Sequence, residues 1–135
     1  LLADPRDPKV KDKVNDIKRR QKFRPFAPSI LSEHVDDYFV TDKYQNYDYM
    51  QYAIPCKRKH EIPSVVHADG SSRVHTVTKQ SKEHSPLREI LELWYKETGC
   101  PVLLNTSLNI KGMPMVNDHN DAKEFSKKYN VQVII

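Results

Sequence analysis

The sequence predicts a single domain of the α/β or α+β class, in which helices pack on a mixed, twisted sheet. Two observations lead to this prediction. In the second half of the chain, segments with helical spacing of apolar residues alternate with short apolar runs typical of strands. In the middle, the pair Asp69-Gly70 stands between two strand-like segments, as in a hairpin. With 135 residues and 38% hydrophobic content, the chain is long enough for one core and short for two. We therefore expect residues 1–135 to form one domain.

The first predicted helix covers about residues 8–21. Asp7 can cap its free N–H groups, and Pro8 is tolerated in a first helical turn. Apolar residues at helical spacing give it one inward stripe, which Lys18 borders. The other basic residues of this segment are expected on the solvated face: Lys11, Lys13, Arg19 and Arg20.

An extended segment must follow, because the two prolines of Phe23-Arg24-Pro25-Phe26-Ala27-Pro28 keep their predecessors out of the α region. A short helix is expected near residues 32–39. A polar, tyrosine-rich loop then leads into a strand in which Met50, Tyr52 and Ile54 alternate.

The hairpin prediction pairs residues 64–68 with residues 72–78 around Asp69-Gly70. Its second strand would place Arg73, His75 and Val77 on one face.

The last elements have clear boundaries. Ser85-Pro86 predicts the start of a helix that Gly99 closes, and residues 101–105 read as a buried strand. Asn117 or Asp118 can cap one more helix, and residues 131–135 are predicted to form a final strand.

Composition restricts the class of protein. The net charge of +4 and pI near 9.0 favour anionic partners. No stretch approaches the roughly 20 apolar residues of a membrane span, and the N-terminus lacks the order of a signal peptide, so we expect a cytoplasmic location without membrane contact. Cys56 and Cys100 are predicted to be buried thiols, and the six histidines show no metal-binding spacing, so no metal site is expected. The start at Leu1, without methionine, indicates a piece of a longer chain.

The candidate ligand-binding residues follow the strand at 101–105. Four small hydrogen-bonding residues lie within five positions there: Asn105, Thr106, Ser107 and Asn109. In open α/β sheets ligands bind at the carboxyl ends of strands, and such side chains can orient a phosphate or a planar carbonyl-like group. Lys18, Arg24 and Arg73 can supply countercharge, although each taken alone reads more simply as a solvated cation. No Walker or GxGxxG motif is present, so a nucleotide would need another cradle.

Five segments, in this order, resemble the C-terminal region of the O-carbamoyltransferase family of nodulation-factor and antibiotic-tailoring enzymes: LLADPR, IKRRQKFRPFAPS, VVHADGSSRVHTV, TGCPVLLNTSLNIKGMPMV and DAKEF. The resemblance covers nearly the whole chain. It implies a YrdC-like fold and an upstream actin/hexokinase-like domain that carries the acceptor site and its metal. The family's GPRALGNRS-like motif would lie immediately before Leu1 and is missing.

The resemblance also implies a chemistry. The YrdC-like domain uses carbamoyl phosphate and ATP, with Mg²⁺ as nucleotide counter-ion, to form carbamoyl adenylate for transfer to an acceptor hydroxyl. The resemblance assigns Lys18, Arg24 and Arg73 to the catalytic site as phosphate contacts. Asn105, Thr106, Ser107 and Asn109 would bind substrate. The family often has glutamine where this chain has His75, which leaves substrate preference open.

Three alternatives remain at the level of sequence. A YrdC-like domain can instead make threonylcarbamoyl adenylate, but the FRPFAP and NTSLN stretches resemble the carbamoyltransferases more closely. A basic RNA-binding domain is disfavoured because the chain shows no alternation of basic and aromatic residues. The chain can also be a fragment that is inert in full carbamoyl transfer without its upstream domain.

Overall fold

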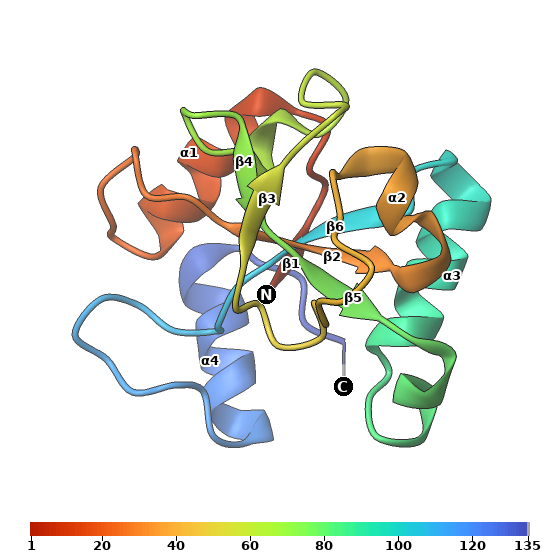
Figure 1. The fold of residues 1–135 in the computed structure, drawn as a ribbon. Coiled ribbons are helices and arrows are strands. Elements are labelled where there is room, and N and C mark those ends of the chain that lie inside the picture. The colour runs from red at the N-terminus through yellow and green to blue at the C-terminus, as the bar shows by residue number, and fades with distance from the viewer. Residues whose placement is uncertain (135) are drawn as a thin grey trace.

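A four-stranded mixed sheet forms the centre of the molecule (Figure 1). The structure is a computed structural model and describes residues 1–134. The strands lie in the order β1–β6–β2–β5, and their bounds are Leu2–Ala3 (β1), Ala27–Leu31 (β2), His75–Val77 (β5) and Val102–Asn105 (β6). Strand β2 runs parallel to β5 and antiparallel to β6, which also runs antiparallel to β1. The predicted α+β class with a mixed sheet is confirmed.

Helix α1 (Pro8–Ile17) begins where the sequence predicts, because the Asp7 side chain accepts the N–H of Lys9. It ends earlier than the predicted residue 21. Lys18 is the C-cap, and Arg19 takes a left-handed backbone conformation with φ 51°. Arg20 therefore lies outside the helix, and its position does not follow the helical spacing of α1.

The predicted hairpin is wrong in its partners. The turn around Asp69-Gly70 exists, with the His67 N–H donating to the Ser71 carbonyl, but residues Pro63–Val65 form a 3-10 turn. Strand β4 (Ser71–Arg73) pairs instead with β3 (Ala53–Pro55) in a separate two-stranded sheet. The predicted strand 72–78 is thus divided between two sheets.

The segment before β3 also differs from its prediction. The short helix is present as a 3-10 turn at Ser32–His34 followed by α2 (Val35–Tyr38). The strand predicted from Met50 onward begins only at Ala53, because Met50 adopts φ 53°, which no strand residue has.

The C-terminal half follows the prediction until its last residues. Helix α3 (Leu87–Thr98) ends at Gly99 with φ 72°, and α4 (His119–Tyr129) is capped by the Asp118 side chain. The predicted final strand is wrong for residues 131–134, which belong to no strand, and Ile135 lies outside the described residues.

The sheet is covered on both faces (Figure 1). On one face, Ile30 of β2 and Leu104 of β6 pack with Val14 of α1. On the other, Leu31 and Leu103 pack with Leu91 of α3. Nonpolar burial of this kind supplies roughly 25 cal/mol for each Å² removed from water.

One buried arginine connects α3 to the sheet. Arg88 is 1% exposed and donates to both Glu33 oxygens, at 2.6 and 2.9 Å, to Glu92 at 2.8 Å and to the Val77 carbonyl at 2.8 Å. Its hydrogen bonds lower the pKa of Glu33 to about 2.

Cys56 and Cys100 are buried free thiols, as predicted, and burial raises the pKa of both. Among the described residues, none of the helices combines the length and the apolar character needed to cross a bilayer.

Candidate functional site

A cavity of about 350 Å³ lies where the ends of several elements meet. The start of β2, the end of β6 and the end of β4 contribute Ala27, Asn105 and Arg73. The complete lining is Arg20, Pro25, Phe26, Ala27, Met50, Arg73, Asn105, Thr106 and Ser107. Four of the predicted site residues, Arg73, Asn105, Thr106 and Ser107, therefore lie around one space.

The charge of this cavity is positive. Two arginines line it, and none of the lining residues that the structure describes carries a carboxylate. Within residues 1–134, Arg20, Arg24 and Arg73 make no ion pair, whereas Arg6, Arg58 and Arg88 each contact a carboxylate. Guanidinium groups left without an acidic partner at a concave surface are suited to bind a phosphate.

Arg20 is the residue that sequence reasoning missed. Its Cζ lies 4.9 Å from the ring centroid of Phe26, and its Nη2 lies 3.5 Å from the Pro25 carbonyl oxygen. Its Nε is buried and has no hydrogen-bond partner in the described part of the chain. Burial, and then the charge of Arg24, lower the pKa of Arg20. An anion beside this guanidinium would reduce the repulsion between the two arginines.

Lys18 is buried behind the polar loop. Its side chain is 2% exposed, and its Nζ donates to the carbonyl oxygens of Ser107, at 2.5 Å, and Asn109, at 3.0 Å. It also reaches Asn109 Oδ1 at 2.9 Å and Ser107 Oγ at 3.3 Å. The structure thus brings Lys18, Ser107 and Asn109 together, although Lys18 and Asn109 do not line the cavity themselves.

The environment of Lys18 perturbs its protonation. Burial, and secondly the positive charge of Arg20, lower the pKa of the Lys18 amine to about 8. Its positive charge is therefore present near neutral pH and lost in mildly alkaline solution.

The polar loop after β6 reaches this cavity because of a strand arrangement that differs from the expected parallel one. The expectation relied on the carboxyl ends of parallel strands, but β6 is antiparallel to both of its neighbours. Asn105, at the end of β6, consequently pairs with Ala27, at the start of β2. The loop after β6 and the Pro25-Phe26 segment before β2 meet at this edge because the two strands run in opposite directions.

Arg24 lies next to this site and not in its lining. It is exposed, and its backbone is held by the Asn15 side chain, whose Nδ2 donates to the Arg24 carbonyl at 3.3 Å. After burial, the positive charge of Arg24 is the second cause that lowers the pKa of Arg20.

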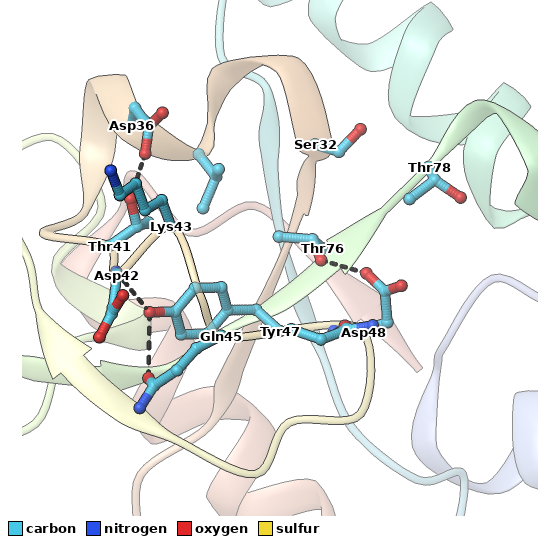
Figure 2. Close-up of a pocket in the computed structure, with 12 residues that line it drawn as sticks. Ser32, Asp36, Thr41, Asp42, Lys43, Gln45, Tyr47, Asp48, Thr76 and Thr78 are labelled. Atoms are coloured by element: carbon cyan, nitrogen blue, oxygen red, sulfur yellow. Dashed lines mark hydrogen bonds between the residues drawn. The ribbon is translucent and has the colours of Figure 1, made fainter.

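A second cavity, of about 390 Å³, lies beyond β5 and contrasts with the first in charge (Figure 2). Three aspartates and a single lysine line it: Asp36, Asp42, Asp48 and Lys43. Figure 2 shows that its polar groups already pair with one another, as Thr76 does with Asp48 and Tyr47 with Gln45. This space does not fit a phosphate. The pairs instead hold the 41–49 loop in place, and that loop leads to Met50 in the wall of the first cavity.

Metal-binding groups are not assembled in the described residues, where no three His, Cys, Asp or Glu side chains come together as a candidate set of ligands. A divalent cation in the first cavity would need oxygen ligands from elsewhere.

Comparison with known proteins identifies relatives along the whole chain. A family model described as "Carbamoyltransferase C-terminus" matches residues 1–135. Nodulation protein NolNO of Sinorhizobium fredii is 36% identical over 126 residues, which cover 90% of this chain and 18% of that protein. Nodulation protein U of Rhizobium tropici is 36% identical over 127 residues, covering 94% and 22% respectively. Nodulation protein U of Bradyrhizobium diazoefficiens is 34% identical over 134 residues, covering 97% and 23%. The chain thus spans roughly a fifth of the length of these relatives.

Proposed function

Because the chain belongs to the carbamoyltransferase family, as its C-terminal region, we propose that the Arg20–Arg73 cavity binds carbamoyl phosphate together with the phosphates of ATP. One observation carries this proposal. Two arginines that form no ion pair with any residue in the described range 1–134 share the cavity with the consecutive polar residues Asn105, Thr106 and Ser107.

The lining matches the two parts of carbamoyl phosphate. Guanidinium groups form charge-assisted hydrogen bonds with phosphate oxygens, and they keep their charge at any physiological pH. The amide and hydroxyl groups of the Asn105–Ser107 segment can hydrogen bond to the carbonyl and amino groups of the carbamoyl part. Lys18, one layer behind, adds positive charge and holds the loop in place through its four contacts.

The proposed reaction forms carbamoyl adenylate. Water cleaves the phosphate from carbamoyl phosphate, and an oxygen of the resulting carbamate attacks the α-phosphorus of ATP, so that phosphate and pyrophosphate leave. Both steps concentrate negative charge, which fixed cations stabilise because they need no reorganisation during the reaction. We assign this role to Arg20 and Arg73, which line the cavity, with Arg24 beside it.

Mg²⁺ fits this site only as an ion that ATP brings with it. Among the described residues no carboxylate lines the cavity, and Mg²⁺ prefers oxygen ligands, so the phosphates of the nucleotide would hold it. None of the roles given to the residues of this chain depends on it.

Transfer to an acceptor hydroxyl requires more than this chain. The relatives are about five times as long, and we propose that an upstream actin/hexokinase-like domain supplies the acceptor site. The purified chain should therefore bind carbamoyl phosphate without sustaining transfer. Two free thiols are consistent with a reducing compartment, and we propose a cytoplasmic location.

Calorimetric titration of the chain with carbamoyl phosphate tests the binding proposal. Arg73→Ala and Arg20→Ala should each weaken binding by about 10- to 100-fold, because each removes a charge-assisted contact of roughly 1.5–3 kcal/mol. Lys22→Ala is the matched control, since Lys22 is exposed and does not line the cavity. Equal affinity in wild type, Arg20→Ala and Arg73→Ala would show that the ligand binds elsewhere.

A further inference from the structure

A chain of hydrogen bonds crosses three adjacent strands and ends at the cavity. Asn105 of β6 donates from Nδ2 to Oγ of Ser29 of β2 at 3.0 Å. Ser29 Oγ lies 2.9 Å from Nδ1 of His75 of β5. Ser29 is fully buried and His75 partly buried, while Asn105 lines the cavity. The three side chains connect the interior of the sheet to the proposed carbamoyl phosphate site.

The Ser29 hydroxyl can donate one hydrogen bond and accept two, and donation to His75 gives each group of this chain a partner. The Ser29 hydroxyl has one proton and already accepts from Asn105, so it can give that proton to His75 Nδ1. Nδ1 must then be unprotonated, with the ring proton on Nε2. Burial lowers the pKa of His75, which favours this neutral form.

The consequence is a defined orientation of the Asn105 amide. Because Nδ2 is bound to Ser29, the other end of the amide, Oδ1, is the atom left to accept a hydrogen bond. Without His75 as proton acceptor, the Ser29 hydroxyl could donate to Oδ1, and the amide could turn its NH₂ toward the cavity.

We infer that Ser29 and His75 are positioning residues that hold Asn105 with its carbonyl oxygen available to the ligand, and so make the cavity selective for a ligand that carries an NH₂ group. This inference rests on the proposed function and adds to it a reason why the cavity would prefer carbamoyl phosphate to analogues without an NH₂ group. A site built to accept an N–H rejects an analogue that lacks it, because the acceptor then stays unpaired.

The test compares three ligands. Acetyl phosphate has a methyl group in place of the NH₂ of carbamoyl phosphate, and inorganic phosphate lacks the whole carbamoyl group. Calorimetry on the whole chain gives the three affinities. Wild type should bind carbamoyl phosphate about 5- to 10-fold more tightly than acetyl phosphate, the size of one hydrogen bond. Ser29→Ala and His75→Ala should bring this ratio close to one and leave the affinity for inorganic phosphate within about twofold. His75→Gln should keep the ratio, because the glutamine Oε1 can accept the Ser29 proton.

The outcomes separate this inference from the proposal beneath it. Binding of carbamoyl phosphate and phosphate that depends on Arg73, with an unchanged ratio in Ser29→Ala, would overturn the inference alone. Absence of binding by both ligands would overturn the proposed function and the inference with it. Thermal unfolding of each variant identifies any that fails to fold. The side-chain amide signal of Asn105 in NMR spectra of wild type, His75→Ala and His75→Gln gives a second readout, and it should move only in His75→Ala.

Discussion

Lys18 Nζ lies 2.9 Å from Asn109 Oδ1, although 91 positions separate the two residues in the sequence. Ser107 Oγ donates to the same Asn109 oxygen at 2.7 Å, so amine, hydroxyl and amide form one compact cluster. The Lys111 N–H also donates to the Lys18 carbonyl. The end of α1 and the loop after β6 are therefore fixed to each other by both side chains and backbone.

Removing the Lys18 amine should loosen this connection. Lys18→Met leaves the carbonyl oxygens of Ser107 and Asn109 without this donor and removes one of the two hydrogen bonds to Asn109 Oδ1, which should lower the free energy of unfolding by about 1–3 kcal/mol. Denaturant unfolding measures the change. Lys22→Met, on the exposed segment four residues later, should change stability by less than about 0.5 kcal/mol. Equal stability of the two variants would contradict the role given to Lys18.

The stability of the chain should depend on pH through Lys18. Its amine has a folded-state pKa of about 8, compared with an ordinary value of 10.5, because burial disfavours the charged form. Between these two pH values the unfolded chain binds more protons than the folded chain, so the contribution of Lys18 to stability rises with pH across this window. The difference in unfolding free energy between wild type and Lys18→Met, measured at about pH 7, 8, 9 and 10, should increase in favour of wild type. A difference independent of pH would show that Lys18 has a normal pKa.

Arg88→Met should destabilise the sheet and α3 together. The substitution leaves the buried Val77 carbonyl without a donor and separates Glu33 from its cation, which should cost about 2–4 kcal/mol. Thermal or denaturant unfolding measures it. Lys96→Met on the same helix is exposed and should have little effect. A loss below about 1 kcal/mol would mean that the Arg88 contacts only offset the cost of burying its charge.

Asp118→Ala should destabilise α4 by about 1 kcal/mol. The Asp118 side chain accepts the N–H groups of Asn120, at 2.8 Å, and Asp121, at 2.9 Å, which otherwise lack helical partners. Asp118→Ser retains an acceptor and should keep most of the stability. Circular dichroism during unfolding distinguishes the two variants, and identical midpoints would argue against the cap.

Local signals in the sequence were sufficient for several elements. The sequence predicts Asp7 as a helix cap, Asn117 or Asp118 as another, and Gly99 as a helix end, because the residues that form these features lie within a few positions of one another; the structure selects Asp118 as the cap of α4. The β4 pairing was not predictable in this way. Residues 64–68 were the nearest partner, but Ser71–Arg73 pairs with Ala53–Pro55, and that choice depends on packing across the whole domain.

The same difference between local signals and long-range packing explains which residues of the site could be predicted from the sequence. Asn105, Thr106, Ser107 and Arg73 were found because of their residue type and their place after strands, and the structure groups them around one cavity. Arg20 was assigned to a solvated helix face on the assumption that the helix continued to residue 21. The left-handed conformation of Arg19 ends that periodicity, so the position of Arg20 could not be read from helical spacing.

The strand order β1–β6–β2–β5 has a consequence for the growth of the chain on the ribosome. Both neighbours of β2 are synthesised long after it, since Ser29 lies opposite His75 on one side and Leu103 on the other. Until then an apolar strand with two open edges is exposed to other nascent chains, and folding must wait for contacts between distant residues. Pro28, which has no N–H to offer, makes that waiting strand a poorer template for aggregation.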